Sequence, residues 1–180
     1  SILSGVGTAT TSGQIQIRTP DAGTTTKGVS GALVFSSGIA SCGASGSISI
    51  GTGTAANGEG GDISVEIGDS NAESGGTMLL QAGKTSADFN GGDITIRSGA
   101  TTGTGGGNGG AMSLSAGQSA AVVGGAFSVS SGQGGTIGGK IKLVAGTGDA
   151  NTGGMVSILS GVGTATTSGQ IQIRTPDAGT

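Results

Sequence analysis

A glycine-led unit of about fifteen residues recurs along the chain and limits what the chain can fold into. Each repeat unit begins with a leading Gly, after which two apolar residues alternate with unconstrained ones, as in GSISIGTG, GDITIRSG and GAFSVSSG. A small residue and a closing Gly usually end this stretch, and Pro20 replaces the closing Gly in one unit. Strict alternation between turn residues is typical of β-strands, and no stretch shows the 3.6-residue apolar period of a helix. The leading glycines are Gly13, Gly31, Gly46, Gly61, Gly76, Gly92, Gly110, Gly125, Gly139, Gly154 and Gly169.

A longer period is superimposed on the short one. The opening segment 1–24, SILSGVGTATTSGQIQIRTPDAGT, recurs without change as the segment 157–180, so that Gly13 returns as Gly169. Ten steps between leading glycines fill this 156-residue offset. We expect the chain to be a window of a longer tandem array of 156-residue repeats, in which the shared segment is the overlap of one copy with the next. A single protein with a duplicated terminal segment is the alternative.

The period of two assigns the side chains of each unit to two faces. The positions two and four residues after the leading Gly are apolar in all ten units, and they are predicted to point inward as a core ladder. The outward positions between them vary in charge and size, as Arg18, Asp62 and Lys140 show. The ladder consists of Ile15, Ile17, Leu33, Phe35, Ile48, Ile50, Ile63, Val65, Met78, Leu80, Ile94, Ile96, Met112, Leu114, Phe127, Val129, Ile141, Leu143, Val156 and Ile158.

These features predict an all-β fold, a thin single-stack parallel β-solenoid (β-helix) with one coil of about 15–16 residues per unit. Ten coils would make each 156-residue repeat, and residues 1–180 would form one continuous segment with essentially no helix. Glycines at the corners are expected to adopt positive φ. Small residues such as Ala72 and Ala121 are expected to pack on the ladder from a return segment. The two longest units, with loop ends PDAGTTTKGVS and GATTGTGGGNGG, are expected to bulge outward.

Residues that carry catalysis or bind metals are scarce. The chain has no His, Trp or Tyr, which excludes His-based triads and His metal sites and predicts neither an enzyme nor a metal or cofactor site. Cys42, the single Cys, occupies an inward small position and is predicted to be a buried packing thiol, with a reactive or intermolecular thiol as the alternative. Asp62, Glu66 and Asp69 lie within one unit, but they lack the calcium-binding nonapeptide pattern and are interpreted as solvated charges.

Charge and surface composition limit the classes of partner that the chain is expected to bind. Seven basic residues are spread among ten acidic ones, which does not favour nucleic-acid binding, and no transmembrane or lipidation signal is present. The outward residues are too mixed for the regular threonine ranks of an ice-binding surface. Val144, Met155 and Leu159 form an outward apolar trio, which we interpret as a candidate lateral contact between copies of the chain; scattered surface apolar residues are the equally open alternative.

The GGDITIRSG-type units resemble the Gly/Ser/Thr-rich β-solenoid repeats of extracellular fibres, adhesive strands and surface appendages, including algal cell-surface proteins and phage fibres. The resemblance extends over the whole chain and implies an extracellular or cell-surface location. It implies a structural repeat that gives a fibre or filament shaft its length and stiffness, with copies of the chain itself as partners. An adhesive or ligand-binding module that uses the variable outward residues is the alternative function.

Overall fold

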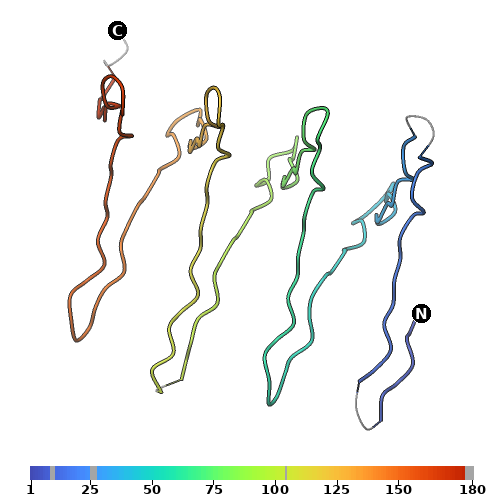
Figure 1. The fold of residues 1–180 in the computed structure, drawn as a ribbon. Coiled ribbons are helices and arrows are strands. Elements are labelled where there is room, and N and C mark those ends of the chain that lie inside the picture. Colours follow the sequence, from blue (N-terminus) through green and yellow to red (C-terminus); the bar gives the residue numbers. More distant parts are fainter. Residues whose placement is uncertain (9–10, 25–27, 104, 177–180) are drawn as a thin grey trace. The chain divides into compact units, whose positions relative to one another are not determined.

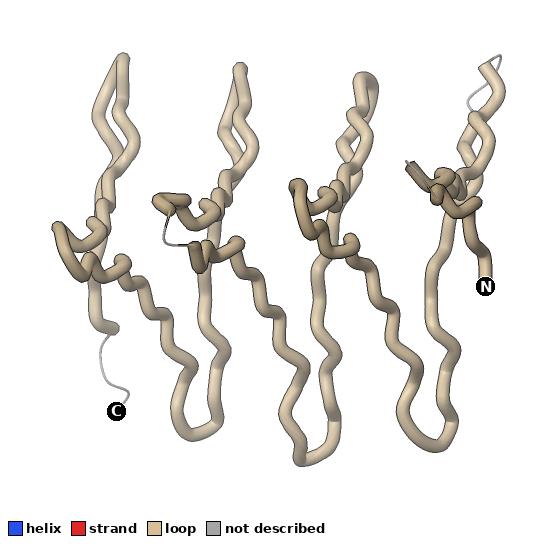
Figure 2. The backbone as a smooth tube through the Cα atoms, turned by 90° about the horizontal axis from the view of Figure 1, so that it is seen from below, coloured by secondary structure: helices blue, strands red, loops and turns tan. Residues whose placement is uncertain are grey.

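The computed structural model describes residues 1–8, 11–24, 28–103 and 105–176. The chain divides into an N-terminal half, Ser1–Ser86, and a C-terminal half, Ala87–Thr180, and each half is described by itself. Within these described ranges there is no helix and no β-strand, so no element has bounds to give. The backbone instead follows an irregular path of extended runs joined by narrow hairpin-like bends (Figures 1 and 2).

This path contradicts the predicted all-β solenoid, and the prediction of a β-solenoid or β-helix is wrong. A β-strand exists only where the N–H and C=O groups of an extended segment pair with those of a neighbouring segment. The described runs have no such neighbour, because the backbone hydrogen bonds that join one part of a repeat unit to another are local closures of bends. The alternating pattern thus produces extended backbone without a sheet.

The bends keep the period of the repeat units. In the part of the chain that the structure describes, bends of three or four residues lie at 41–43, 56–58, 71–73, 86–89, 120–122, 135–137, 149–151 and 164–166, with further single-residue bends at Thr8 and Gly105. From 41–43 onward, neighbouring bends are therefore spaced by about one unit. Successive bends point to different sides, and in the C-terminal half the bends at 120–122 and 164–166 point to the same side (Figures 1 and 2). One repeat unit therefore contributes one extended run and one bend. It does not make the complete coil that the sequence predicted.

In six places within the described residues, the chain is closed at the base of a loop by a contact that we call the neck, between a closing glycine and the leading glycine of the next unit. In the neck around residues 147–153, the Gly154 N–H donates to the Gly146 carbonyl at 2.9 Å. Among the described residues the same bond, at 2.8 to 3.0 Å, joins Gly13 to Gly5, Gly110 to Gly99, Gly125 to Gly117, Gly139 to Gly132 and Gly169 to Gly161. In these six necks the carbonyl of the closing glycine is the acceptor.

A side-chain hydroxyl reinforces one of these necks, and a similar hydroxyl contact joins Thr19 to the leading glycine Gly31. The Ser131 hydroxyl, next to closing Gly132, donates to the Gly139 carbonyl at 3.0 Å. The Thr19 hydroxyl, next to Pro20, donates to the Gly31 carbonyl at the same distance. The Ser131 hydroxyl thus bridges its neck in the direction opposite to the backbone bond.

Close packing at the neck explains why the leading residue is glycine. A Cβ added to Gly139 would lie 3.2 Å from Ser131 Cβ, and one added to Gly154 would lie 3.3 Å from Ala145 Cβ. In these two necks the small residue before the closing glycine makes this contact with the leading glycine; at Gly76 the neighbour is Ile67 instead. A Cβ at closing glycines such as Gly117 or Gly146 would meet nothing within 4 Å.

The expected positive φ at the corners is found at two glycines of the described residues, Gly43 with φ 118° and Gly106 with φ 92°. The other described glycines do not use left-handed backbone. The prediction that corner glycines generally supply positive φ is therefore wrong, because most leading glycines are required by the neck crossing instead. Of the two predicted bulges, residues 25–27 and 104 lie outside the described residues.

The chain leaves most of its surface in contact with solvent. It exposes 18012 Å² for a mass of 16.6 kDa. A folded monomer of this mass exposes roughly 7,600 Å² and a fully unfolded chain roughly 24,000 Å². No buried residue, apolar or polar, occurs among those the structure describes. The single chain thus has no hydrophobic core in its described part.

Candidate functional site: the apolar ladder

The extended runs place alternate side chains on opposite sides of the backbone. The Ser64 hydroxyl donates to Glu66 Oε1 at 2.8 Å, and the Gln172 amide donates to Gln170 Oε1 at 3.3 Å. Both bonds join residues two apart, which share one side of an extended chain. Ile63 and Val65 of the ladder alternate with Ser64 and Glu66, so these ladder residues belong to the opposite side.

The ladder residues are partly shielded, but none is buried. The first residue of each ladder pair is between 49% and 61% exposed, and the second is between 54% and 79% exposed. The outward residues Met155 and Leu159 are more open, at 85% and 83% exposed, whereas Val144, at 72%, lies within the range of the ladder. Two of the three outward residues therefore differ from the ladder in exposure, while the assignment of the ladder to a core stays a prediction.

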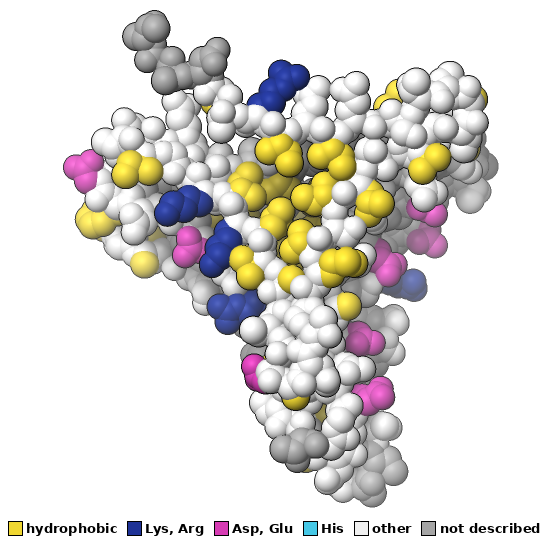
Figure 3. Space-filling view, turned by 90° about the vertical axis from the view of Figure 1, so that its left-hand side faces the viewer, with side chains coloured by type: hydrophobic (Ala, Val, Ile, Leu, Met, Phe, Trp, Pro, Cys, Tyr) yellow, Lys and Arg dark blue, Asp and Glu magenta, His cyan; other side chains and the backbone are white. Residues whose placement is uncertain are grey.

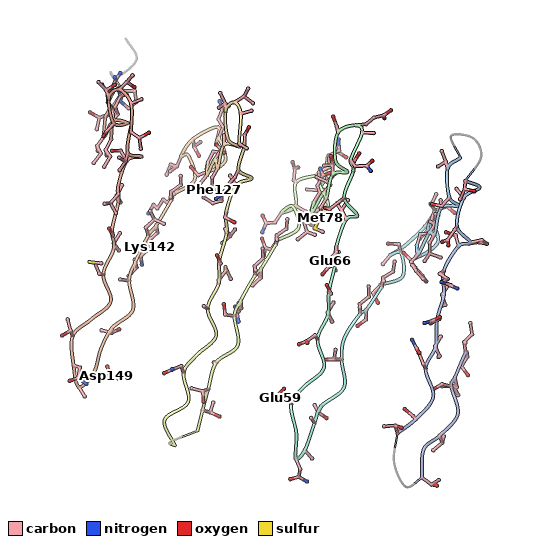
Figure 4. All side chains as sticks on the ribbon, in the orientation of Figure 1. Glu59, Glu66, Met78, Phe127, Lys142 and Asp149 are labelled. Carbon is pink, nitrogen blue, oxygen red and sulfur yellow. The ribbon has the colours of Figure 1, made fainter. Side chains whose placement is uncertain are left out.

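Ladder residues lie on the runs, and several charged residues lie close to the bends. Figure 4 shows Met78 and Phe127 on extended parts of the chain, with Glu59 and Asp149 close to bends at the opposite end of the drawing. Asp149 belongs to the bend at 149–151, and Glu59 directly follows the bend at 56–58. Charged residues thus occur both close to bends and at outward positions of the runs, whereas all the ladder positions are apolar.

Two residues of the outward apolar trio lie close in sequence to the neck between Gly146 and Gly154. Val144 lies two residues before Gly146, and Met155 directly follows Gly154, so the neck bond brings their segments together. Leu159 lies four residues further along the run. The structure thus joins two members of the trio through one neck, and the lateral contact itself stays a prediction.

The other candidate residues are accessible. Cys42 is a free, exposed thiol in the bend at 41–43, so the prediction that it is buried is wrong. The predicted burial needed a return segment packed on the ladder, and no residue is buried in the part of the chain that the structure describes. Within the described ranges, Asp62, Glu66 and Asp69 do not belong to any cluster of three or more metal-ligating side chains.

Neither a pocket nor an apolar helix long enough to cross a membrane occurs in the part of the chain that the structure describes. The main surfaces available for contact in these residues are therefore the extended apolar faces of the ladder, with glycine necks between several of them. Sequence reasoning missed the neck itself, although its signal was present as the recurring pair of a small residue and Gly seven residues or more before most leading glycines.

No family model matches the sequence, and comparisons with curated proteins and with solved structures found no match.

Proposed function

We propose that this chain is a structural repeat of an extracellular filament, in which its copies associate and the array provides length. The observation that carries the proposal is the exact recurrence of segment 1–24 as segment 157–180. Filaments need contacts that recur along the chain, because a contact that does not close on itself propagates into an open assembly. The extracellular location rests on the resemblance to fibre repeats.

The two copies of the duplicated segment have matching local structure, which supports a repeat that is structural as well as sequential. Gly13 bonds to Gly5 in the first copy as Gly169 bonds to Gly161 in the second. A Cβ on Gly7 would collide with the Thr11 carbonyl, and the equivalent Gly163 is crowded by Thr167 in the same way. A contact made through one copy is therefore available through the other.

The role proposed is mechanical and not catalytic. Ladder residues are identical in kind from unit to unit, whereas catalysis requires different side chains converging on one point. The proposal predicts filaments of uniform width when the purified chain is concentrated and viewed by negative-stain electron microscopy, with no ligand added. A chain that stays monodisperse at all concentrations would overturn it.

A second candidate, an adhesive module, is favoured by the variation among outward residues. Asp62 and Glu66 make one run acidic, whereas Lys140 and Lys142 make another basic. Such differences are expected where separate units contact different chemical groups of a surface. Discrete rods that bind a surface and do not grow with concentration would support this candidate over the filament.

A further inference from the structure

We infer that the ladder faces are interfaces between copies of this chain, so that ordering of the runs is coupled to assembly. This inference rests on the proposed function, which it deepens by naming the surface that joins the copies. The occupant is a second copy of the chain. Three observations carry it: the surface area left exposed, the chemistry of the ladder, and its spacing.

The exposed area is too large for a chain that is complete on its own. The 18012 Å² that it exposes is more than twice the roughly 7,600 Å² of a folded monomer of the same mass. The excess, roughly 10,000 Å², exceeds even the roughly 2,000–5,000 Å² that obligate interfaces bury. Several contacts with partners are needed to remove such an area from water.

The chemistry of the ladder suits a partner of the same kind. Apolar side chains gather in the middle of the face shown in Figure 3, and Lys, Arg, Asp and Glu side chains lie toward its edges. Obligate interfaces between identical chains have this arrangement of an apolar centre and a polar rim. The net charge of −3 over 180 residues leaves little repulsion between copies.

The spacing of the ladder pairs favours a second copy of the chain over an unrelated partner. Within each half the ladder pairs recur once per repeat unit, and bends lie between them. A second copy presents apolar pairs at the same intervals, so contacts can match over many units. The extended runs form no β-strand within the described ranges, and contact between chains is one way to pair their backbone groups away from water.

The test uses the full chain and two variants at neighbouring positions. Ile96 belongs to the ladder, and Arg97 is the next residue on the opposite side of the same run. Sedimentation velocity over a concentration series measures the concentration at which assemblies form, and amide hydrogen exchange measures protection of the runs in the same samples. Protection in the wild-type chain should rise together with assembly and be absent at high dilution.

Ile96→Asp should raise the assembly concentration at least about tenfold, because an unpaired carboxylate would be buried in an apolar contact. Ile96→Ala should raise it less, and Arg97→Asp should leave it within about twofold. The runs are exposed in the single chain, so these variants do not disturb a core.

Three results would overturn the inference: protected runs in a dilute monomer, assembly without a gain in protection, or equal effects of Ile96→Asp and Arg97→Asp. Its failure is distinguishable from that of the proposed function. Closed oligomers that depend on Ile96 would refute the filament and keep the ladder interface. Filaments built from monomers whose runs are already protected from hydrogen exchange would refute the ladder interface and keep the filament.

Discussion

The bend between Gly146 and Gly154 offers a test in which two glycine substitutions have opposite effects. A Cβ on Gly148 would lie 2.6 Å from the Thr152 carbonyl oxygen and 2.7 Å from that of Asn151. Ordinary contacts of a Cβ begin at 3.4 Å, so both backbone carbonyls would have to move. Gly146, two residues away, has nothing within 4 Å of its Cβ position and does not have positive φ.

The surroundings of Gly148 and Gly146 determine how much each substitution should change the opening of the neck. Overpacking against backbone costs about 1–3 kcal/mol, so Gly148→Ala should open the neck at least about fivefold more often, up to the unprotected limit. Gly146→Ala should stabilise the closed bend by about 0.4–1 kcal/mol, because alanine restricts the open chain and fits the closed one. The neck should then open about two to five times less often.

Amide hydrogen exchange of the Gly154 N–H, followed by NMR below the concentration of assembly, reports this opening directly. That N–H donates the neck bond to the Gly146 carbonyl, which both variants retain. Exchange should become faster in Gly148→Ala and slower in Gly146→Ala. Equal shifts in the two variants, or slower exchange in Gly148→Ala, would refute the account of the neck.

Two further predictions concern single side chains. Ser119→Ala removes the hydroxyl oxygen that accepts the Val122 N–H at 3.1 Å, so exchange of that N–H should accelerate by about two- to tenfold, whereas Ser128→Ala should leave it unchanged. Cys42 is free and exposed, so it should react with a thiol reagent at the same rate in native buffer and in denaturant; a rate that rises strongly on denaturation would place the thiol in a protected site.

Local features of the structure could be predicted from sequence, whereas the pairing of one extended run with another could not. The glycine and small-residue pattern located the repeat units, and one bend lies in each of the regular units that the structure describes. The period of two agrees with the bond between Ser64 and Glu66, which places those outward side chains on one side. Which run lies beside which is a non-local property, because an alternating pattern determines only the face of each residue. The predicted sheet therefore failed at the step that needed a neighbour.

The sequence pattern also could not show why glycine occupies the leading position of each unit. Glycine before an alternating stretch is compatible with positive φ at a corner and with a close crossing of two backbones. The crossing at Gly139, where Ser131 Cβ occupies the space of a side chain, could be recognised only once both sides of the neck were placed. The same holds for Cys42, whose small inward position in the repeat became an exposed position in a bend.

The necks give the chain a way to respond to pulling. Each described neck fastens a loop whose two ends are held by a backbone hydrogen bond, so force along the chain loads that bond first. When the neck between Gly146 and Gly154 opens, the eight residues of that step can span up to about 26–29 Å from end to end. The loop closes again when tension falls, because the partners stay tethered through a short segment. A series of such necks would let the array lengthen in steps and absorb mechanical work before any covalent bond is strained.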